Sequence, residues 1–254
     1  MDNKIISFDI KADFGFLKKP DTNEPVYLTF NMLHKPALLG ILGAILGLEG
    51  FQENENLPEY YKTLNKLKIG IKPLRDEKGN FQKTVIRYSN SVGYANLDGG
   101  TLIVDEQTLI APSYRCYLLL NSDEELHKKL RQRLLNHQAE YLPYLGKNDF
   151  SLWWEEVKEW DFKSFQSDSS FKIESIFIKE KPVKEGKSES TFNLMTGGES
   201  GSFMYFENLP VAYHPELYQY KYKPFAYTDW ALEQNYKVND LYKLSNNGPI
   251  VQLF

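Results

Sequence analysis

The side chains that most often perform catalysis or bind metals are few in this sequence. It contains four histidines, His34, His127, His137 and His214, and a single cysteine, Cys116. They do not recur at the short spacings from which metal sites are built, and one cysteine cannot form an internal disulfide. The sequence therefore predicts neither a metal centre nor a bound cofactor. A lone thiol is also typical of a reducing, cytoplasmic compartment.

A glycine-rich apolar stretch, HKPALLGILGAILGL at residues 34–48, raises the question of phosphate binding. Its glycines, Gly40, Gly43 and Gly47, fit neither the GxGxxG nor the Walker pattern, which excludes a phosphate-cradling loop of that kind. The apolar run is shorter than the roughly 18 to 20 residues that cross a bilayer. We interpret it as a helix beginning near Pro36, whose glycines each cost about 1 kcal/mol in helix propensity. They would let another backbone approach closely, either by packing on a sheet, which is favoured, or by meeting a ligand or partner.

Charge is distributed unevenly along the chain. The protein has 254 residues, a formal net charge of -4 and a pI near 5.7. Residues 60–90 nevertheless hold eight lysines and arginines against two acids, a net charge of +6 that leaves -10 for the remainder. The overall acidity argues against an indiscriminate nucleic-acid binder. The basic segment is suited to phosphate contacts, or it is only a solvated face.

Hydrophobic periodicity predicts an alternation of strands and helices. Apolar residues alternate through IISFDIKA and predict a half-buried strand at 4–12. Ser122 followed by Glu125 predicts a capping box at the start of a second helix. The other expected elements are a helix from residue 36 to about 47–50 and strands within 66–74, 108–120 and 171–179. The order strand, helix, strand, strand, helix, strand is that of an α+β, ferredoxin-like (RRM-like) fold.

Two further segments are expected around this unit. Turn signals at 79–80 and 99–100 predict a β-hairpin inserted at about 74–108, which includes part of the basic segment. Short alternating segments after residue 180 include aromatic residues from Tyr218 onward, which either cover a core, as favoured, or stack nucleobases. We therefore divide the chain into a ferredoxin-like unit at 1–180 and a β-rich extension at 181–254 that packs on it.

Five segments of the chain occur in the order seen in a known protein family: FDIKADFGFLKKPDTN, HKPALLGILGAILGLE, EQTLIAPSYRCYLLL, PYLGKNDF and the terminal PIVQLF. By these motifs the chain resembles the fifth CRISPR-associated (Cas) family of the RAMP superfamily, most of all its type I-B branch. The resemblance implies a ferredoxin-like palm carrying a β-hairpin thumb. It also implies a non-catalytic subunit of the Cascade surveillance complex, which caps the 5′ handle of the guide RNA in antiviral defence. The expected partners are this guide RNA, the backbone and large subunits and, indirectly, target DNA.

The resemblance also implies which residues bind RNA. They are Lys18, Lys19, Thr22, Asn23, His34, Lys35, Arg75, Lys83, Arg87, Tyr88 and Asn90. The first six occupy or follow two signatures of the family. Lys18 and Lys19 stand in the aromatic-Arg-Lys signature, where this chain has Leu17 in place of the aromatic residue. His34 and Lys35 stand in the Pro-Pro-Arg signature, where this chain has Leu33 in place of the first proline. The last five lie in the thumb. There the cations are expected to clamp phosphates, and Tyr88 and Asn90 to stack on or hydrogen-bond a splayed base.

Two other functions remain open at this point. In the type I-C branch the corresponding subunit resembles a metal-independent endoribonuclease that cuts the guide precursor with tyrosine, lysine and histidine side chains. Acid–base cleavage at a 2′-hydroxyl needs such a group within hydrogen-bond reach, and His34 with Lys35 or Tyr27 is the cluster that the sequence offers. The other possibility is a structural bridge whose basic thumb faces acidic proteins.

Overall fold

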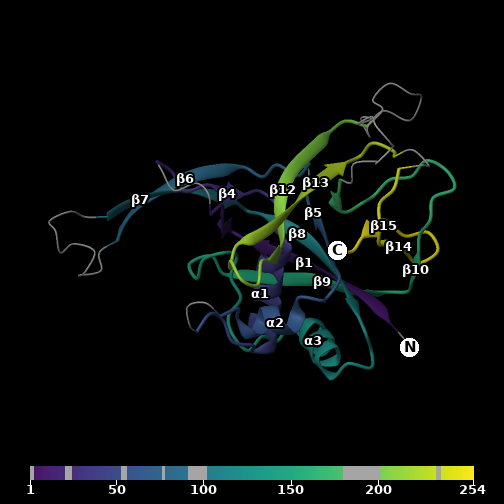
Figure 1. Ribbon diagram of the computed structural model, residues 1–254, viewed down its shortest axis with the longest axis horizontal. Coiled ribbons are helices and arrows are strands. Elements are labelled where there is room, and N and C mark those ends of the chain that lie inside the picture. The colour runs from purple at the N-terminus through teal and green to yellow at the C-terminus, as the bar shows by residue number, and fades with distance from the viewer. Residues whose placement is uncertain are drawn as a thin grey trace.

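The computed structural model of the protein describes residues 3–20, 25–52, 56–75, 78–90, 102–179, 201–232 and 236–254. Its centre is an antiparallel sheet of four strands in the order β5-β8-β1-β9 (Figure 1). These strands are β1 (Lys4–Ala12), β5 (Ile69–Pro73), β8 (Ser113–Leu120) and β9 (Leu152–Trp160). The α+β class predicted from the sequence is confirmed.

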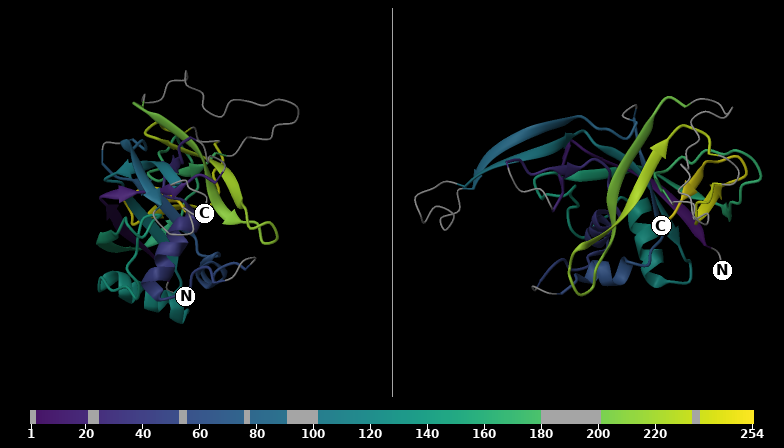
Figure 2. Two further views of the ribbon diagram at one scale, coloured as in Figure 1. Left: turned by 90° about the vertical axis from the view of Figure 1, so that its left-hand side faces the viewer. Right: turned by 45° about the horizontal axis from the view of Figure 1, so that its top comes forward.

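Three helices gather on one side of this sheet (Figures 1 and 2). Between β1 and β5 the chain forms α1 (Lys35–Leu46) and α2 (Glu59–Leu64), and between β8 and β9 it forms α3 (Glu125–Leu135). The main core lies beneath them, where Phe8 of β1 packs in one buried cluster with leucines of α1 and α3. The helix predicted from residue 36 is therefore present, and its leucines face the sheet.

The other face of the sheet is also covered. Ile5 of β1 and Tyr117 of β8 form a second buried cluster with Val251 and other apolar residues of the C-terminal strands. These strands are β14 (Leu241–Leu244) and β15 (Ile250–Gln252). The half-buried strand predicted at 4–12 is thus correct in its extent but wrong in its burial, because the C-terminal part of the chain removes its second face from water.

The fourth strand of the central sheet is not the one predicted. Strand β9 comes from SLWWEEVKEW, an acidic segment that was predicted to be only a connection, whereas 171–179 contributes only the short β11 (Phe177–Ile178). Leu152 and Trp154 supply the buried face of β9. The carboxylates beside them are neutralised from neighbouring elements, Glu155 by Lys11 of β1 and Glu159 by Arg131 of α3. Ion pairs with cations that are distant in sequence thus allow this acidic segment to form a strand of the central sheet.

The predicted capping box is also wrong. The N-cap of α3 is Glu124, whose side chain makes no cap hydrogen bond. The first turn is held instead by His127, whose Nδ1 accepts a hydrogen bond from the backbone N–H of Asn121 at 3.0 Å.

A long hairpin projects away from the helices (Figures 1 and 2). It consists of β6 (Lys83–Asn90) and β7 (Leu102–Ile110), paired antiparallel, and β2 (Phe14–Gly15) pairs with the base of β7. Beside it, β3 (Leu17–Lys18) pairs with β4 (Thr29–Phe30). The inserted hairpin predicted within 74–108 is confirmed.

A second hairpin belongs to the C-terminal part. Its strands are β12 (Met204–Tyr213) and β13 (Tyr220–Thr228), with β11 paired to β13, and β12 packs on α1. The short β10 (Phe162–Ser164) pairs with β14. The β-rich extension is therefore present, while the predicted boundary at residue 180 lies outside the described residues. The described helices include none long and apolar enough to cross a membrane.

The glycines of α1 meet α2 rather than the sheet. A Cβ atom added to Gly43 would lie 2.5 Å from the Cβ of Tyr60, whereas one added to Gly40 would lie 3.7 Å from the Tyr60 ring. Gly47 has a separate reason to be glycine, since it is the left-handed C-cap with φ 81°. The close approach inferred from the sequence is real, but its partner is a second helix.

These two contacts predict opposite effects of the same substitution. Gly43→Ala is expected to lower the free energy of unfolding by about 1–3 kcal/mol, because the Cβ of Tyr60 cannot move without its backbone. Gly40→Ala is expected to be neutral or to stabilise by up to about 1 kcal/mol, through better helix propensity at an ordinary contact distance. Urea unfolding of the two variants checks this, and equal stabilities would contradict it.

Candidate functional site

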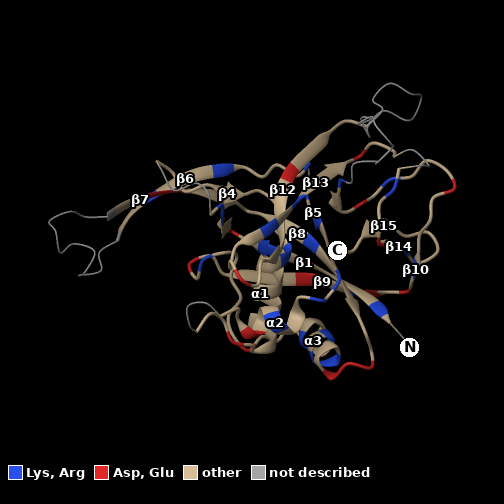
Figure 3. Cartoon of the chain, viewed as in Figure 1, with Lys and Arg blue, Asp and Glu red and all other residues tan. Residues whose placement is uncertain are grey.

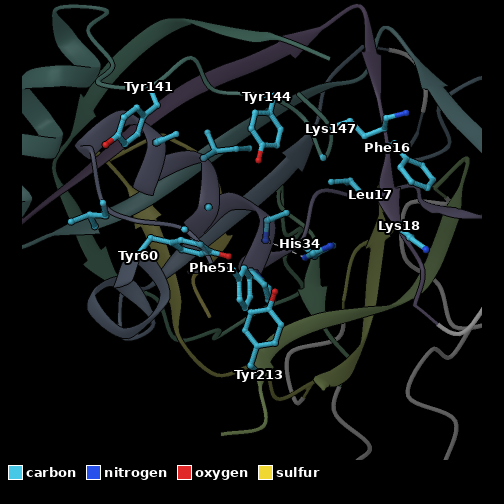
Figure 4. Close-up of a pocket in the computed structure, with 18 of the residues that line it drawn as sticks. Phe16, Leu17, Lys18, His34, Phe51, Tyr60, Tyr141, Tyr144, Lys147 and Tyr213 are labelled. Atoms are coloured by element: carbon cyan, nitrogen blue, oxygen red, sulfur yellow. Dashed lines mark hydrogen bonds between the residues drawn. The ribbon is translucent and has the colours of Figure 1, made fainter. Parts of the chain in front are cut away.

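A pocket of about 630 Å³ opens between α1, the start of β3, the 141–147 segment and the β12–β13 hairpin (Figure 4). The α1 residues that line it are Pro36, Ala37, Gly40, Ile41 and Ala44, and the three alanine and glycine positions among them leave space beside the helix. The aromatic residues that line it are Phe16, Phe51, Tyr60, Tyr141, Tyr144, Tyr213 and Tyr220. Its cations are Lys18 and Lys147, which Figure 4 shows on the same side, next to Phe16. We call this the aromatic pocket.

The PYLGKNDF segment builds one side of the aromatic pocket. Leu145 is fully buried, and its carbonyl accepts a hydrogen bond from the backbone N–H of Phe16 at 3.0 Å. Gly146 has φ 89°, and a Cβ there would lie 1.7 Å from the carbonyl oxygen of Phe16. Only glycine fits this position, and it directs the next residue, Lys147, toward the β6–β7 hairpin.

Lys147 joins the aromatic pocket to the β6–β7 hairpin. Its Nζ lies 3.1 and 3.3 Å from the two carboxylate oxygens of Glu106, a residue of β7 that is only 1% exposed. It also lies 4.5 Å from the ring centroid of Tyr88 in β6. Burial alone would lower the pKa of Lys147, but the hydrogen bond and charge of Glu106 raise it above its usual value. The predicted stacking residue Tyr88 thus carries a lysine on one face and is 38% exposed.

A second pocket, of about 650 Å³, lies on the other side of the lysine pair Lys18–Lys19. It is lined by Lys19, Phe30, Tyr205, Phe206, Glu207, Asn208 and Tyr222. Because successive side chains of an extended segment point to opposite sides, Lys18 reaches the aromatic pocket and Lys19 the second one. Tyr220 and Tyr222 of β13 are two residues apart and so share one face of the strand, where Tyr220 lines the first pocket and Tyr222 the second. Their ring centroids are 6.1 Å apart, so the two pockets are neighbours.

Glu207 organises the cations around the second pocket. Its carboxylate accepts hydrogen bonds from the backbone N–H groups of Asn31 and Met32, both at 3.1 Å, and lies 3.6 Å from the Nζ of Lys19. The side chain of Asn31 in turn accepts a hydrogen bond from the Nζ of Lys83 at 2.8 Å. Burial lowers the pKa of Lys83; the charge of Glu207 opposes this shift and that of Lys19 adds to it. Lys19 and Lys83 were predicted from two separate regions of the sequence. In the structure they are close enough that the charge of Lys19 helps to lower the pKa of Lys83.

His34 and Lys35 are buried at the start of α1. His34 is the N-cap, and its Nδ1 accepts a hydrogen bond from the backbone N–H of Ala37 at 3.3 Å. Burial lowers the pKa of His34 to about 3, so the imidazole is neutral at physiological pH. Lys35 donates from Nζ to the carbonyl of Phe254 at 2.9 Å, and burial together with the charge of Lys68 lowers its pKa to about 8. Both side chains make contacts that hold the fold together.

The remaining predicted residues lie apart from the pockets or outside the described residues. Arg75 donates to the carbonyl of Ala111 at 3.4 Å. Arg87 forms two hydrogen bonds to Asp105 across the hairpin, at 2.6 and 2.7 Å. Thr22 and Asn23 lie outside the described residues, and of Asn90 only the backbone position at the end of β6 is described.

The basic segment at 60–90 is spread over α2, β5 and the β6–β7 hairpin (Figure 3). Acids from later in the chain balance some of it, since Lys68, just before β5, pairs with Asp240 and Lys72 of β5 pairs with Glu174. The local excess of +6 therefore does not correspond to a single basic face. Within the part of the chain that the structure describes, no group of three or more histidine, cysteine, aspartate or glutamate side chains is placed to hold a metal ion.

Several residues of the pockets were not predicted from the sequence, among them Tyr60, Tyr144 and Lys147. One signal was present for the last two, because both belong to the PYLGKNDF motif. Tyr60 had no signal of its own, since its place is decided by how α2 packs on α1.

Solved structures similar to this chain include several CRISPR proteins. A CRISPR protein from Archaeoglobus fulgidus superposes over 98% of this chain and 97% of its own, at 16% sequence identity and a TM-score of 0.50. A chain of a type III-B Cmr-β complex bound to cognate target RNA and AMPPnP covers 97% and 99%, at 9% identity and a TM-score of 0.48. A chain of a CRISPR RNA-guided surveillance complex covers 91% and 92%, at 9% identity and a TM-score of 0.46. No family model and no curated protein matches the sequence. The likeness to the Archaeoglobus protein, over almost the whole of both chains, shows a shared fold.

Proposed function

We propose that this chain is a non-catalytic, RNA-binding subunit of a CRISPR effector complex, and that it caps the 5′ handle of the guide RNA in a type I Cascade. The order of its sequence motifs supports this proposal, as does the fold that it shares with a CRISPR protein. The type I-B branch and contacts to backbone and large subunits are part of the same proposal, and rest on the motifs alone.

The observation that carries the proposal is the gathering of cations and exposed aromatic rings on one surface. Lys18 and Lys147 line the aromatic pocket, and Lys19 lines its neighbour, close to Lys83. Single-stranded RNA is bound by this combination, in which cations hold the backbone and aromatic rings stack on unpaired bases. Lysine binds phosphate as a point charge, which suits contact with a backbone more than recognition of a base.

The state of His34 supports a role without catalysis. A general base works best when its pKa lies near the working pH, whereas burial brings the pKa of His34 to about 3. Its Nδ1 lone pair is already used, because it accepts a hydrogen bond from the backbone N–H of Ala37. The endoribonuclease alternative would need this residue as its proton-transfer group.

We expect the purified protein to bind a labelled guide-precursor RNA and to leave it uncut, with or without a chelator. His34→Asn is the appropriate variant, because asparagine is a good N-cap, whereas alanine would lose about 1 kcal/mol of helix capping. His34→Asn should fold as the parent does and should likewise leave the RNA uncut. A gel of the RNA gives both results. Specific, chelator-resistant cleavage by the parent that disappears in His34→Asn would replace the capping role with the endoribonuclease.

A further inference from the structure

The aromatic pocket is apolar and roomy where the neighbouring surface is charged. Its volume of about 630 Å³ falls in the range of pockets that enclose small organic groups. Along α1 three of the five lining residues are small, Ala37, Gly40 and Ala44, and the other two are Pro36 and Ile41. The opposite walls are tyrosine and phenylalanine rings. A flat, partly apolar group is the chemistry that such walls accommodate best.

Two tyrosines present accessible rings at the pocket. Tyr144 is 44% exposed and Tyr141 is 55% exposed, although both line the cavity. In Figure 4 these two residues lie across the pocket from Tyr213, with Tyr60 and Phe51 at its side. An aromatic ring that is left half in water gains by stacking on another flat ring.

His34 adds a hydrogen-bond donor to the pocket wall. It is only 4% exposed and lines the cavity. Because its Nδ1 accepts from Ala37 and the imidazole is neutral, the proton resides on Nε2. Among the described residues, no acceptor bonds this Nε2–H. A ligand with a hydrogen-bond acceptor in the plane of its ring would satisfy it, as the carbonyl oxygens and ring nitrogens of nucleobases do.

The cations lie at one side of the pocket. In Figure 4 Lys18 and Lys147 lie on the same side of the pocket with Phe16 between them, and the Nζ of Lys18 is 4.0 Å from the ring centroid of Tyr27. A base inside the pocket would therefore have its phosphate near a lysine, which is the arrangement that one nucleotide of a single strand requires.

We propose that the aromatic pocket binds one unstacked nucleobase of single-stranded RNA, with the base against Tyr144 and its phosphate at Lys18. This inference rests on the proposed RNA-binding function and adds a base-binding site to it. Binding in this pocket requires a base, whereas the lysines alone would bind the phosphates of any oligomer, with or without bases.

The test measures binding of a fluorescent oligouridine RNA, and of an abasic ribose-phosphate oligomer of equal length, by fluorescence anisotropy. Tyr144→Ala removes the accessible ring, and Ala44→Trp fills the cavity from α1. Tyr218→Ala is the matched control, because Tyr218 is 40% exposed and does not line the pocket. Circular dichroism first establishes that each variant is folded.

Tyr144→Ala and Ala44→Trp are each expected to weaken oligouridine binding by about fivefold to a hundredfold, the loss typical of one stacked base. The abasic oligomer should bind the parent more weakly and be insensitive to both variants, and Tyr218→Ala should behave like the parent. If folded Tyr144→Ala and Ala44→Trp bind oligouridine as the parent does, the base pocket is wrong while RNA binding stands. If the parent binds neither oligomer, the base pocket and the proposed function both fail.

Discussion

Replacing Lys147 with methionine is expected to lower the free energy of unfolding by about 2–3 kcal/mol. The reason is Glu106, whose carboxylate is almost fully buried in the hairpin and lies 3.1 Å from the Nζ of Lys147. Removing one partner of a buried ion pair leaves an uncompensated charge, which typically costs about 3–5 kcal/mol. The smaller figure applies here because 24% of the Lys147 side chain remains in contact with solvent.

The neighbouring ion pair on the same hairpin is the natural control. Arg87 pairs with Asp105 in good geometry, but 72% of its side chain is exposed, so solvent screens the attraction. Arg87→Met should hardly change the urea midpoint. In addition, Lys147→Met combined with Glu106→Leu should recover much of the lost stability, since no charge is then left buried. Equal effects of Lys147→Met and Arg87→Met would show that the hairpin is not held to the body by this ion pair.

Local patterns were sufficient to predict much of the fold. Alternation within 4–12 located β1 at its observed bounds, and the glycine-rich stretch located α1. The hairpin insertion followed from the turn signals at 79–80 and 99–100. Each of these depends on residues close together in the chain, which is where periodicity and turn chemistry are informative.

The errors arise from contacts between distant residues. Strand β9 has an acidic sequence that only its partners make suitable for a sheet, since Glu155 meets Lys11 across the strands. The second buried face of β1 exists because the last residues of the chain return to cover it. Such pairings cannot be seen in a local window, and tertiary packing overrides the local preference.

The candidate site was predicted in part for the same reason. Lys18 and Lys19 were expected to bind RNA from their motif positions and Lys83 from its place in the thumb. The fold brings Lys18 and Lys19 to the two neighbouring pockets, and Lys83 close to Lys19. Lys35 was expected there too, but it reaches the carbonyl of Phe254 at the far end of the chain. The aromatic pocket had no single sequence signal, because α1, the PYLGKNDF segment and β13 each contribute only one wall.

The lysines around the two pockets predict a measurable electrostatic signature. Each lysine that neutralises a phosphate of a single strand adds about 0.7 to the slope of log affinity against log salt concentration. A variant with Lys18, Lys19 and Lys83 all changed to alanine is therefore expected to bind single-stranded RNA more weakly, with a slope reduced by roughly 2. A control variant with Lys128, Lys158 and Lys163 changed to alanine has the same change in net charge, at exposed lysines of α3, β9 and β10.

The decisive measurement is a titration of single-stranded RNA with the parent and both triple variants at several salt concentrations, after urea unfolding has established that each is folded. An RNA-binding subunit of the kind proposed should show a steep salt dependence in the parent, a slope lower by roughly 2 in the pocket variant, and a nearly unchanged slope in the control. A parent that does not bind RNA, or a pocket variant that keeps the affinity and slope of the parent, would contradict the account.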